Sequence, residues 1–206
     1  MYETVDEDAQ SLLGFWFGHA ELDAEAIDER NRVWFRSDAA FDRQCRDKFA
    51  TLLAAAASGE LDHWKDSPRG RLAFIVLLDQ LSRNIHRGSA AAYRYDDRAL
   101  AACLEGIELG HDRALSAIER TFFYLPMEHA EDRSIQTASV EHFEALAEEG
   151  PESLRKQLAL NVEYARQHRD IVERFGRFPH RNATLGRAST SEERAYLADD
   201  APRFGQ

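Results

Sequence analysis

The sequence predicts an all-α fold, a single domain of about seven to eight antiparallel helices over residues 1–206. Apolar residues recur at spacings of three and four from one end of the chain to the other, which is the period of a helix with one buried face. Alternating, β-branched segments, which are typical of strands, do not occur. The stretches between the periodic segments are short, so successive helices are expected to pack as antiparallel neighbours, in a bundle or in stacked hairpins.

The amino-terminal part of the chain carries two predicted helices. The first runs over residues 6–17, where a broad apolar face ends at Gly18. Residues 19–36 are predicted to form a loop with at most one helical turn. The second helix extends from Ser37, its predicted N-cap, to Gly59, its predicted stop.

A third helix is predicted to begin with Ser67 as its N-cap and Pro68 as its first residue, because proline suits the first turn of a helix. It contains the run Leu72–Leu78, in which every residue is apolar. A helix that is apolar on all sides has no face to present to solvent. It is therefore expected at the centre of the bundle.

Five further helices complete the predicted fold. Four of them have the predicted ranges 97–109, 113–124, 131–149 and 151–175. The second of these is expected to be interrupted by Pro126, since proline lacks the backbone N–H and crowds the preceding turn. Residues 177–189 are predicted to be a loop. A short last helix follows Thr190, which can form a capping box with Glu193.

Composition and charge exclude several classes of function. The formal net charge of −11 opposes nonspecific binding to nucleic acid or to an anionic membrane, because the long-range field repels phosphate. The longest apolar run is far shorter than the roughly 20 residues of a membrane-spanning helix. The first ten residues are acidic and lack the features of a secretory signal, so the expected location is the cytoplasm. Cys45 and Cys103 lie in separate helical stripes and are expected to remain thiols.

Asp79 and Arg83 form the first group of candidate site residues. Asp79 follows Leu72 by seven positions, so the helix directs its carboxylate along the buried face, with Arg83 one turn later. A buried charge needs a partner. In one interpretation the two residues form an internal ion pair that ends the helix. In the other, Asp79 orients Arg83, whose guanidinium, beside Asn84, receives an anionic group of a ligand.

The second group surrounds Pro126. Glu128, His129 and Glu131 follow the expected helix interruption, and Tyr124 precedes it. Titratable side chains gathered at a helix break are typical of binding sites. The alternative is that these acids stabilise the amino-terminal end of the next helix, with the histidine hydrogen-bonded nearby.

The third group is a cationic loop in an otherwise acidic chain. Residues 174–188 contain four arginines and one histidine but no acid, and the candidates among them are Arg177, His180, Arg181 and Asn182. The loop either pairs with acids on the surface of neighbouring helices or forms the cationic wall of a pocket.

Several familiar chemistries lack support in the sequence. No pair of histidines or cysteines shows the spacing of a metal site, so no metal or other cofactor is expected. Glycine-rich loops for nucleotides and the Gly-x-Ser-x-Gly turn of serine hydrolases are missing as well.

The chain resembles a bacterial family known as Domain of Unknown Function 924. The matching stretches are Gly-Phe-Trp-Phe-Gly at 14–18, Leu-Leu-Asp-Gln and Arg-Asn within 77–84, Phe-Phe-Tyr-Leu-Pro at 122–126 with Glu128, His129 and Glu131, and Arg-Phe-Gly-Arg-Phe-Pro-His-Arg-Asn at 174–182. The family usually has Phe-Pro where this chain has Leu81-Ser82, and Phe and Ser where it has Met127 and Ala130. The resemblance implies a helical fold similar to tetratricopeptide repeats, and it implies no particular reaction.

Two functional hypotheses follow. The first is a pocket for a small anionic molecule, in which Glu128, His129 and His180 are the expected catalytic residues for proton transfer. Its expected ligand-binding residues are Asp79, Arg83, Asn84, Tyr124, Glu131, Arg177, Arg181 and Asn182. The second hypothesis is a tetratricopeptide-like module that binds a peptide or protein without catalysis.

The position of the cationic loop distinguishes these hypotheses. Phe178 and Pro179 place apolar bulk between its cations, which predicts that the loop is docked rather than solvated. We expect residues 177–182 to fold back over Pro126 and to bring Arg177, His180 or Arg181 near Glu128 and the end of the central helix.

Overall fold

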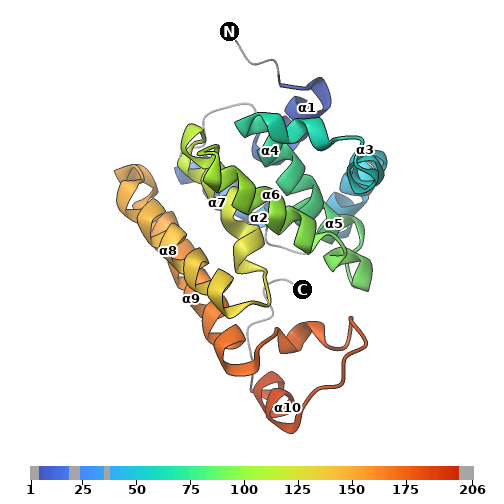
Figure 1. Cartoon of the computed structure of the whole chain (residues 1–206), viewed down its shortest axis with the longest axis vertical. Helices are drawn as coiled ribbons and strands as arrows, with labels where there is room; N and C mark the ends of the chain where they lie inside the picture. The colour runs from blue at the N-terminus through green and yellow to red at the C-terminus, as the bar shows by residue number, and fades with distance from the viewer. Residues whose placement is uncertain (1–4, 19–23, 35–37, 200–206) are drawn as a thin grey trace.

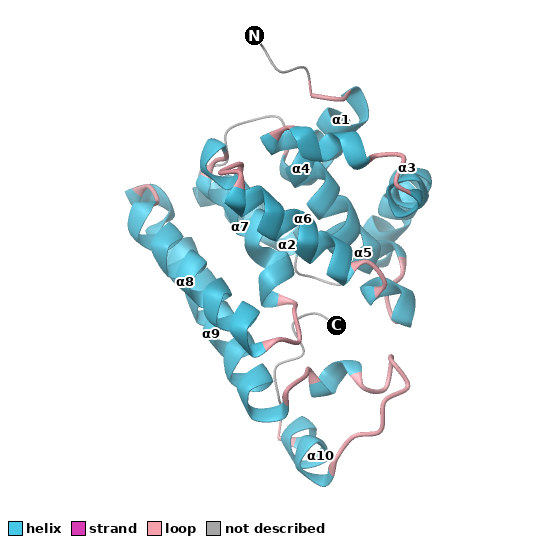
Figure 2. Ribbon diagram, in the orientation of Figure 1, coloured by secondary structure: helices cyan, strands magenta, loops and turns pink. Residues whose placement is uncertain are grey.

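The computed structural model describes residues 5–18, 24–34 and 38–199, and within these ranges it contains helices and turns but no strand (Figure 2). The all-α prediction is confirmed. The α-helices are α1 (Glu7–Phe17), α2 (Ala24–Trp34), α3 (Ala39–Ser58), α4 (Pro68–Ile75), α5 (Ser82–Ile85), α6 (Asp96–Glu108), α7 (Ala117–Glu128), α8 (Arg133–Glu149), α9 (Arg155–Phe175) and α10 (Ser191–Ala198).

The helices surround one central rod. Helices α1, α3, α6 and α7 pack against the rod formed by α4, the π-helical segment η2 (Val76–Leu81) and α5. Helices α8 and α9 form a long antiparallel hairpin along one side of the molecule, and α7 packs against α8 (Figure 1). The chain after α9 turns back beneath the carboxyl end of α5, and α10 lies at that end of the molecule.

The central rod begins as the sequence predicts. The Ser67 hydroxyl accepts a hydrogen bond from the backbone of Gly70 at 3.2 Å, and Pro68 occupies the first turn. All residues from 70 to 85 are buried, which confirms the central position of this helix. The sequence pattern did not predict that the helix widens into a π-helical segment from Val76 to Leu81.

Ile75 tests the packing of this rod. Its side chain has no exposed surface, so Ile75→Ala is expected to lower the free energy of unfolding by roughly 2 to 5 kcal/mol through lost burial and the cavity left behind. Urea unfolding measures this change. A loss below about 1 kcal/mol would show that the centre of the bundle is loosely packed.

The predicted loop before α3 is wrong over much of its length, because α2 occupies Ala24–Trp34. Ile27 and Trp34 are buried on one face of this helix, and the Trp34 indole donates a hydrogen bond to the backbone carbonyl of Trp16 at 3.0 Å. Two apolar side chains seven positions apart are a weak stripe among charged residues, which is why the pattern was missed.

The caps of α3 differ in part from the expectation. Ser37 lies outside the described residues, and the side chain of Asp38 caps the helix by accepting from Ala40 and Phe41. At the other end Gly59 stops the helix as expected, in the left-handed conformation with φ of 92°.

The expected interruption at Pro126 is also wrong. Helix α7 starts later than predicted, with a capping box between Ser116 and Glu119, and it continues through Pro126 to Glu128. The proline lies in the last turn, where the missing N–H costs one hydrogen bond, and buried neighbours on both sides hold the helix in place. The break therefore falls at residues 129–132, and Asp132 caps α8.

Several other local predictions agree with the structure. Gly176 ends α9 in the left-handed conformation, and Thr190 and Glu193 form the expected capping box of α10. Cys45 and Cys103 are buried thiols without a disulfide. Within the described ranges no helix is both long and apolar enough to cross a membrane.

Candidate functional site

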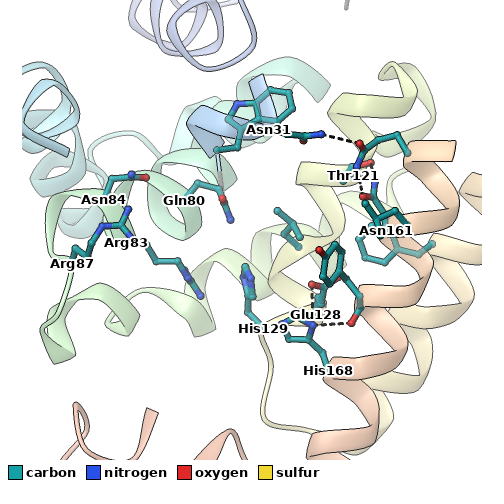
Figure 3. Close-up of a pocket in the computed structure, with 16 residues that line it drawn as sticks. Asn31, Gln80, Arg83, Asn84, Arg87, Thr121, Glu128, His129, Asn161 and His168 are labelled. Atoms are coloured by element: carbon teal, nitrogen blue, oxygen red, sulfur yellow. Dashed lines mark hydrogen bonds and ion pairs between the residues drawn. The ribbon is translucent and has the colours of Figure 1, made fainter. Parts of the chain in front are cut away.

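A cavity of about 420 Å³ opens between the end of the central rod, α7 and α9 (Figure 3). Arg83, Asn84 and Arg87 lie on one side of it, and Glu128 and His168 lie on the opposite side. Apolar side chains from α2, α7, α8 and α9 complete the wall. The cavity is large enough for a small organic molecule.

Asp79 organises one end of this cavity. Its carboxylate is fully buried and lies 3.0 Å from Arg83 Nη1 and 2.8 Å from His129 Nδ1. Gln80 donates a third hydrogen bond to the carboxylate from its side-chain amide. Burial opposes the charge, but Arg83 and His129 outweigh it and hold the pKa of Asp79 well below its usual range. Asp79 therefore carries a negative charge at neutral pH.

The cationic loop reaches this cluster through Arg181. Arg181 Nη1 donates to the backbone carbonyl of His129 at 3.1 Å and lies 3.4 Å from Asp96 Oδ2. The same Asp96 oxygen accepts from Arg83 Nη2 at 3.0 Å. The prediction that Arg181 docks near the end of the central helix agrees with this arrangement, although the contact is at His129 and not at Pro126.

Glu128 and His168 face each other across a short distance. Glu128 Oε1 lies 3.2 Å from His168 Nδ1, and that nitrogen donates to the backbone carbonyl of Tyr164 at 2.8 Å. Burial, with a smaller contribution from Asp79, raises the pKa of Glu128 to about 8. Burial lowers the pKa of His168 well below its usual value. Both groups are therefore neutral at pH 7, and Glu128 carries a proton that it can donate.

His129 is neutral as well. Burial lowers its pKa, and Asp79 only partly offsets this effect. A carboxylate can only accept, so the hydrogen bond to Asp79 fixes the proton on Nδ1 and leaves the lone pair on Nε2. A carboxylate that orients an imidazole in this way is the arrangement of a general base.

A chain of side-chain hydrogen bonds lines the far end of the cavity. Asn31 donates to Gln157 at 2.8 Å, Gln157 to Asn161 at 2.9 Å, and Asn161 to Thr121 at 3.2 Å (Figure 3). Thr121 in turn donates to the carbonyl of Ala117. The chain links α2, α7 and α9 and fixes the orientation of each amide. Its unused donors and acceptors can bind uncharged polar groups of a ligand.

Some predicted site residues lie elsewhere. Tyr124 donates to Asp112 at 2.6 Å and does not line the cavity. The side chain of Arg177 pairs with Glu193, at 2.7 Å, and Asn182 donates to that same carboxylate. Glu131 pairs with Arg187. Arg177 and Asn182 thus hold the loop to α10, and Arg187 holds it to the turn before α8, so these contacts fit the structural alternative for the cationic loop.

Most of the other predicted site residues lie at the cavity or next to it. Among the predicted residues, Arg83, Asn84, Glu128 and His129 line the cavity, and Asp79 and Arg181 support it from behind. His180 faces a second, smaller cavity on the other side of Arg83. The structural alternative for Asp79 and Arg83 is also met, since the two form a buried ion pair.

Sequence reasoning missed Arg87, Asp96 and His168. Arg87 follows Arg83 by four positions, so helical spacing was an available signal. His168 lies within the apolar stripe of α9, where a polar residue on the buried face is itself a signal. Asp96 lies at the start of α6, where an acid is ordinarily explained by the helix dipole.

The described part of the chain contains no cluster of three or more histidine, cysteine or acidic side chains arranged to hold a metal ion.

The fold and the cavity define a class of protein: an all-helical protein with a cavity, lined by both polar and apolar side chains, between its central rod and its terminal hairpin. The chain belongs to a family described as bacterial proteins of unknown function (DUF924), whose model matches residues 12–201. It is similar to a solved protein of unknown function from Agrobacterium tumefaciens, with 41% identity and a TM-score of 0.77 over 92% of this chain and 96% of the other. A search of curated proteins gave no match.

Proposed function

We propose that the protein binds a small organic carboxylate in the cavity of Figure 3 and that Glu128 and His129 exchange protons with it. The charge of the wall carries this proposal. Among the described residues that line the cavity, Glu128 is the only acid, and its raised pKa keeps it neutral at pH 7. Arg83 and Arg87 are then the charged side chains of the wall, and they pair with Asp79 and Asp96 and with Asp42, which do not line the cavity. Guanidinium groups bind carboxylates in a bidentate manner.

The rest of the wall suits the body of such a ligand. Trp34, Leu125 and Phe143 provide apolar surface for carbon atoms. The amide chain of Gln157 and Asn161 offers hydrogen bonds to uncharged polar atoms at the end away from the arginines. A ligand held at both ends would have a fixed orientation.

The two proton-transfer groups are complementary. Glu128 is a protonated carboxyl at neutral pH and is suited to donate a proton. His129 is a neutral imidazole held by Asp79 and is suited to accept one. An acid and a base adjacent in sequence at the end of α7 support a reaction in which one proton is added to the ligand and one is removed.

Arg87 provides the test of this proposal. Arg87→Gln is expected to weaken binding of a carboxylate about tenfold or more, because a charge-assisted hydrogen bond is lost. Isothermal titration calorimetry against a panel of small mono- and dicarboxylates measures the effect. The Arg87 side chain is 29% exposed, and its partner Asp42 keeps a hydrogen bond from Asn84 at 2.8 Å, so the variant is expected to fold.

Arg98→Gln is the matched control. The Arg98 side chain is 31% exposed and also pairs with an aspartate, Asp62, but Arg98 does not line the cavity. Its variant is expected to bind the carboxylate as the wild type does. Equal binding by both variants, or no binding by the wild type to any member of the panel, would contradict the proposal. Binding of peptides that is indifferent to Arg87 would favour the interaction module instead.

A further inference from the structure

A second cavity, of about 320 Å³, lies on the other side of Arg83 and Arg87. It is bounded by the turn after α5 and by the cationic loop, from which His180, Thr184 and Ser189 line it. Arg83 and Arg87 border both cavities. The two arginines therefore form a shared partition between two chambers.

The wall of the second cavity suits an anion. Among the described residues that line it none is acidic, in a chain whose net charge is −11. The wall includes Arg83 and Arg87, which are paired with acids outside the cavity, and the hydroxyl-bearing residues Thr184, Ser189 and Tyr93. Burial lowers the pKa of His180 to about 4, so this side chain adds no charge at neutral pH.

Arg83 has an unused donor. Its two terminal nitrogens are held by Asp79 and Asp96, whereas its Nε atom is buried and has no hydrogen-bond partner among the described residues. The residue as a whole is only 8% exposed. A buried guanidinium donor without a partner is rare and costly in a folded protein, and a ligand oxygen at the partition relieves the cost.

We propose that the second cavity binds a phosphate group, either inorganic phosphate or a phosphate monoester, at a site separate from that of the carboxylate in the first cavity. Donors reach this cavity from two directions, from the arginines at the end of the rod and from the hydroxyls of the loop. The oxygens of a tetrahedral oxyanion lie on all sides of the phosphorus, so they can accept hydrogen bonds from both directions at once. Because both ligands contact the partition, binding of one changes the affinity for the other, and the change is reciprocal.

Thr184→Val tests the assignment without altering the first cavity. Valine keeps the shape of threonine and removes the hydroxyl, and Thr184 lies half-buried in a loop, so the variant is expected to fold. Calorimetric titration with inorganic phosphate should show binding by the wild type and roughly tenfold weaker binding by Thr184→Val. Thr137→Val, on the surface of α8, is the matched control and should bind phosphate as the wild type does.

Gln157→Leu separates this inference from the proposed function. Gln157 lines the first cavity only, so its variant should lose carboxylate affinity and keep phosphate affinity. If carboxylates fail to bind while phosphate binding depends on Thr184, the proposed function is wrong and the phosphate site stands. If the wild type does not bind phosphate, or if Thr184→Val binds it unchanged, the phosphate site is wrong whatever happens in the first cavity.

A second titration identifies the source of the phosphate group. Phenyl phosphate places an apolar ring against Tyr93, Pro179 and Leu197. Tighter binding of phenyl phosphate than of inorganic phosphate would assign the cavity to a monoester. Binding of inorganic phosphate alone would assign it to the free ion.

Discussion

Asp79→Asn is expected to lower the free energy of unfolding by about 3 to 5 kcal/mol, because it removes the charge that compensates a buried arginine. The Asp79 carboxylate is fully buried and accepts from Arg83, His129 and Gln80. Asparagine preserves the shape of the side chain, so the loss reports on charge and not on packing. Arg83 would keep Asp96 as its remaining acidic partner, but Asp96 also forms an ion pair with Arg181.

Asp62→Asn is the control for this experiment. Asp62 also pairs with an arginine, Arg98, but both side chains are partly exposed, and such pairs contribute roughly 0 to 1 kcal/mol. Urea unfolding of both variants at neutral pH gives the comparison. Similar small losses in the two variants would mean that water reaches Asp79 and that the site is open.

Glu128→Gln is expected to change stability in a manner that depends strongly on pH. The Glu128 carboxyl has a pKa of about 8 in the folded protein, against an ordinary value of 4.5 for a glutamate in water. Between these values the folded state binds a proton that the unfolded state has released, so the free energy of unfolding falls as the pH rises. The loss is complete above pH 8 and is on the order of 5 kcal/mol for a difference of this size.

Glutamine cannot ionise, so the variant escapes this loss. We expect Glu128→Gln to match the wild type within about 1 kcal/mol near pH 5 and to exceed its stability by several kcal/mol near pH 9. Glu163→Gln, on the exposed face of α9, should show no such difference between the two pH values. An advantage of Glu128→Gln that is the same at both pH values would be incompatible with a protonated Glu128.

Much of the fold could be predicted because its signals are local. Gly59 and Gly176, the capping box at Thr190, and the apolar run of the central helix each act within a few residues. The prediction of a loop in place of α2 is wrong because that helix is stabilised by the burial of Ile27 and Trp34 against the rest of the protein. Two apolar residues among charged ones form too weak a helical pattern to indicate this burial.

The site was predictable only in part, because its geometry depends on which side chains from distant segments come into contact. Sequence placed Asp79, Arg83, Glu128 and Arg181 in three unusual segments, and the structure brings these segments together. The same reasoning could not assign the cations of the loop, since Arg177 and Arg181 look alike in sequence. Arg177 has the capping acid Glu193 of α10 as its partner, whereas Arg181 is inserted between the rings of Tyr93 and Phe178.

The π-helical segment in the central rod places one extra residue in the turn that carries Asp79 and Gln80. A π-helical turn contains one residue more than the α-helical turn it replaces. Deletion of one residue between Val76 and Leu81 would restore an α-helix, and because the wider turn absorbs the extra residue, the residues that follow would face nearly the same way as before. Arg83 and Arg87 would then keep their place beside both chambers, and the change would be confined to the turn that carries Asp79 and Gln80. A homologue shorter by one residue here would share the architecture and both cavities and would differ in the position of the buried carboxylate.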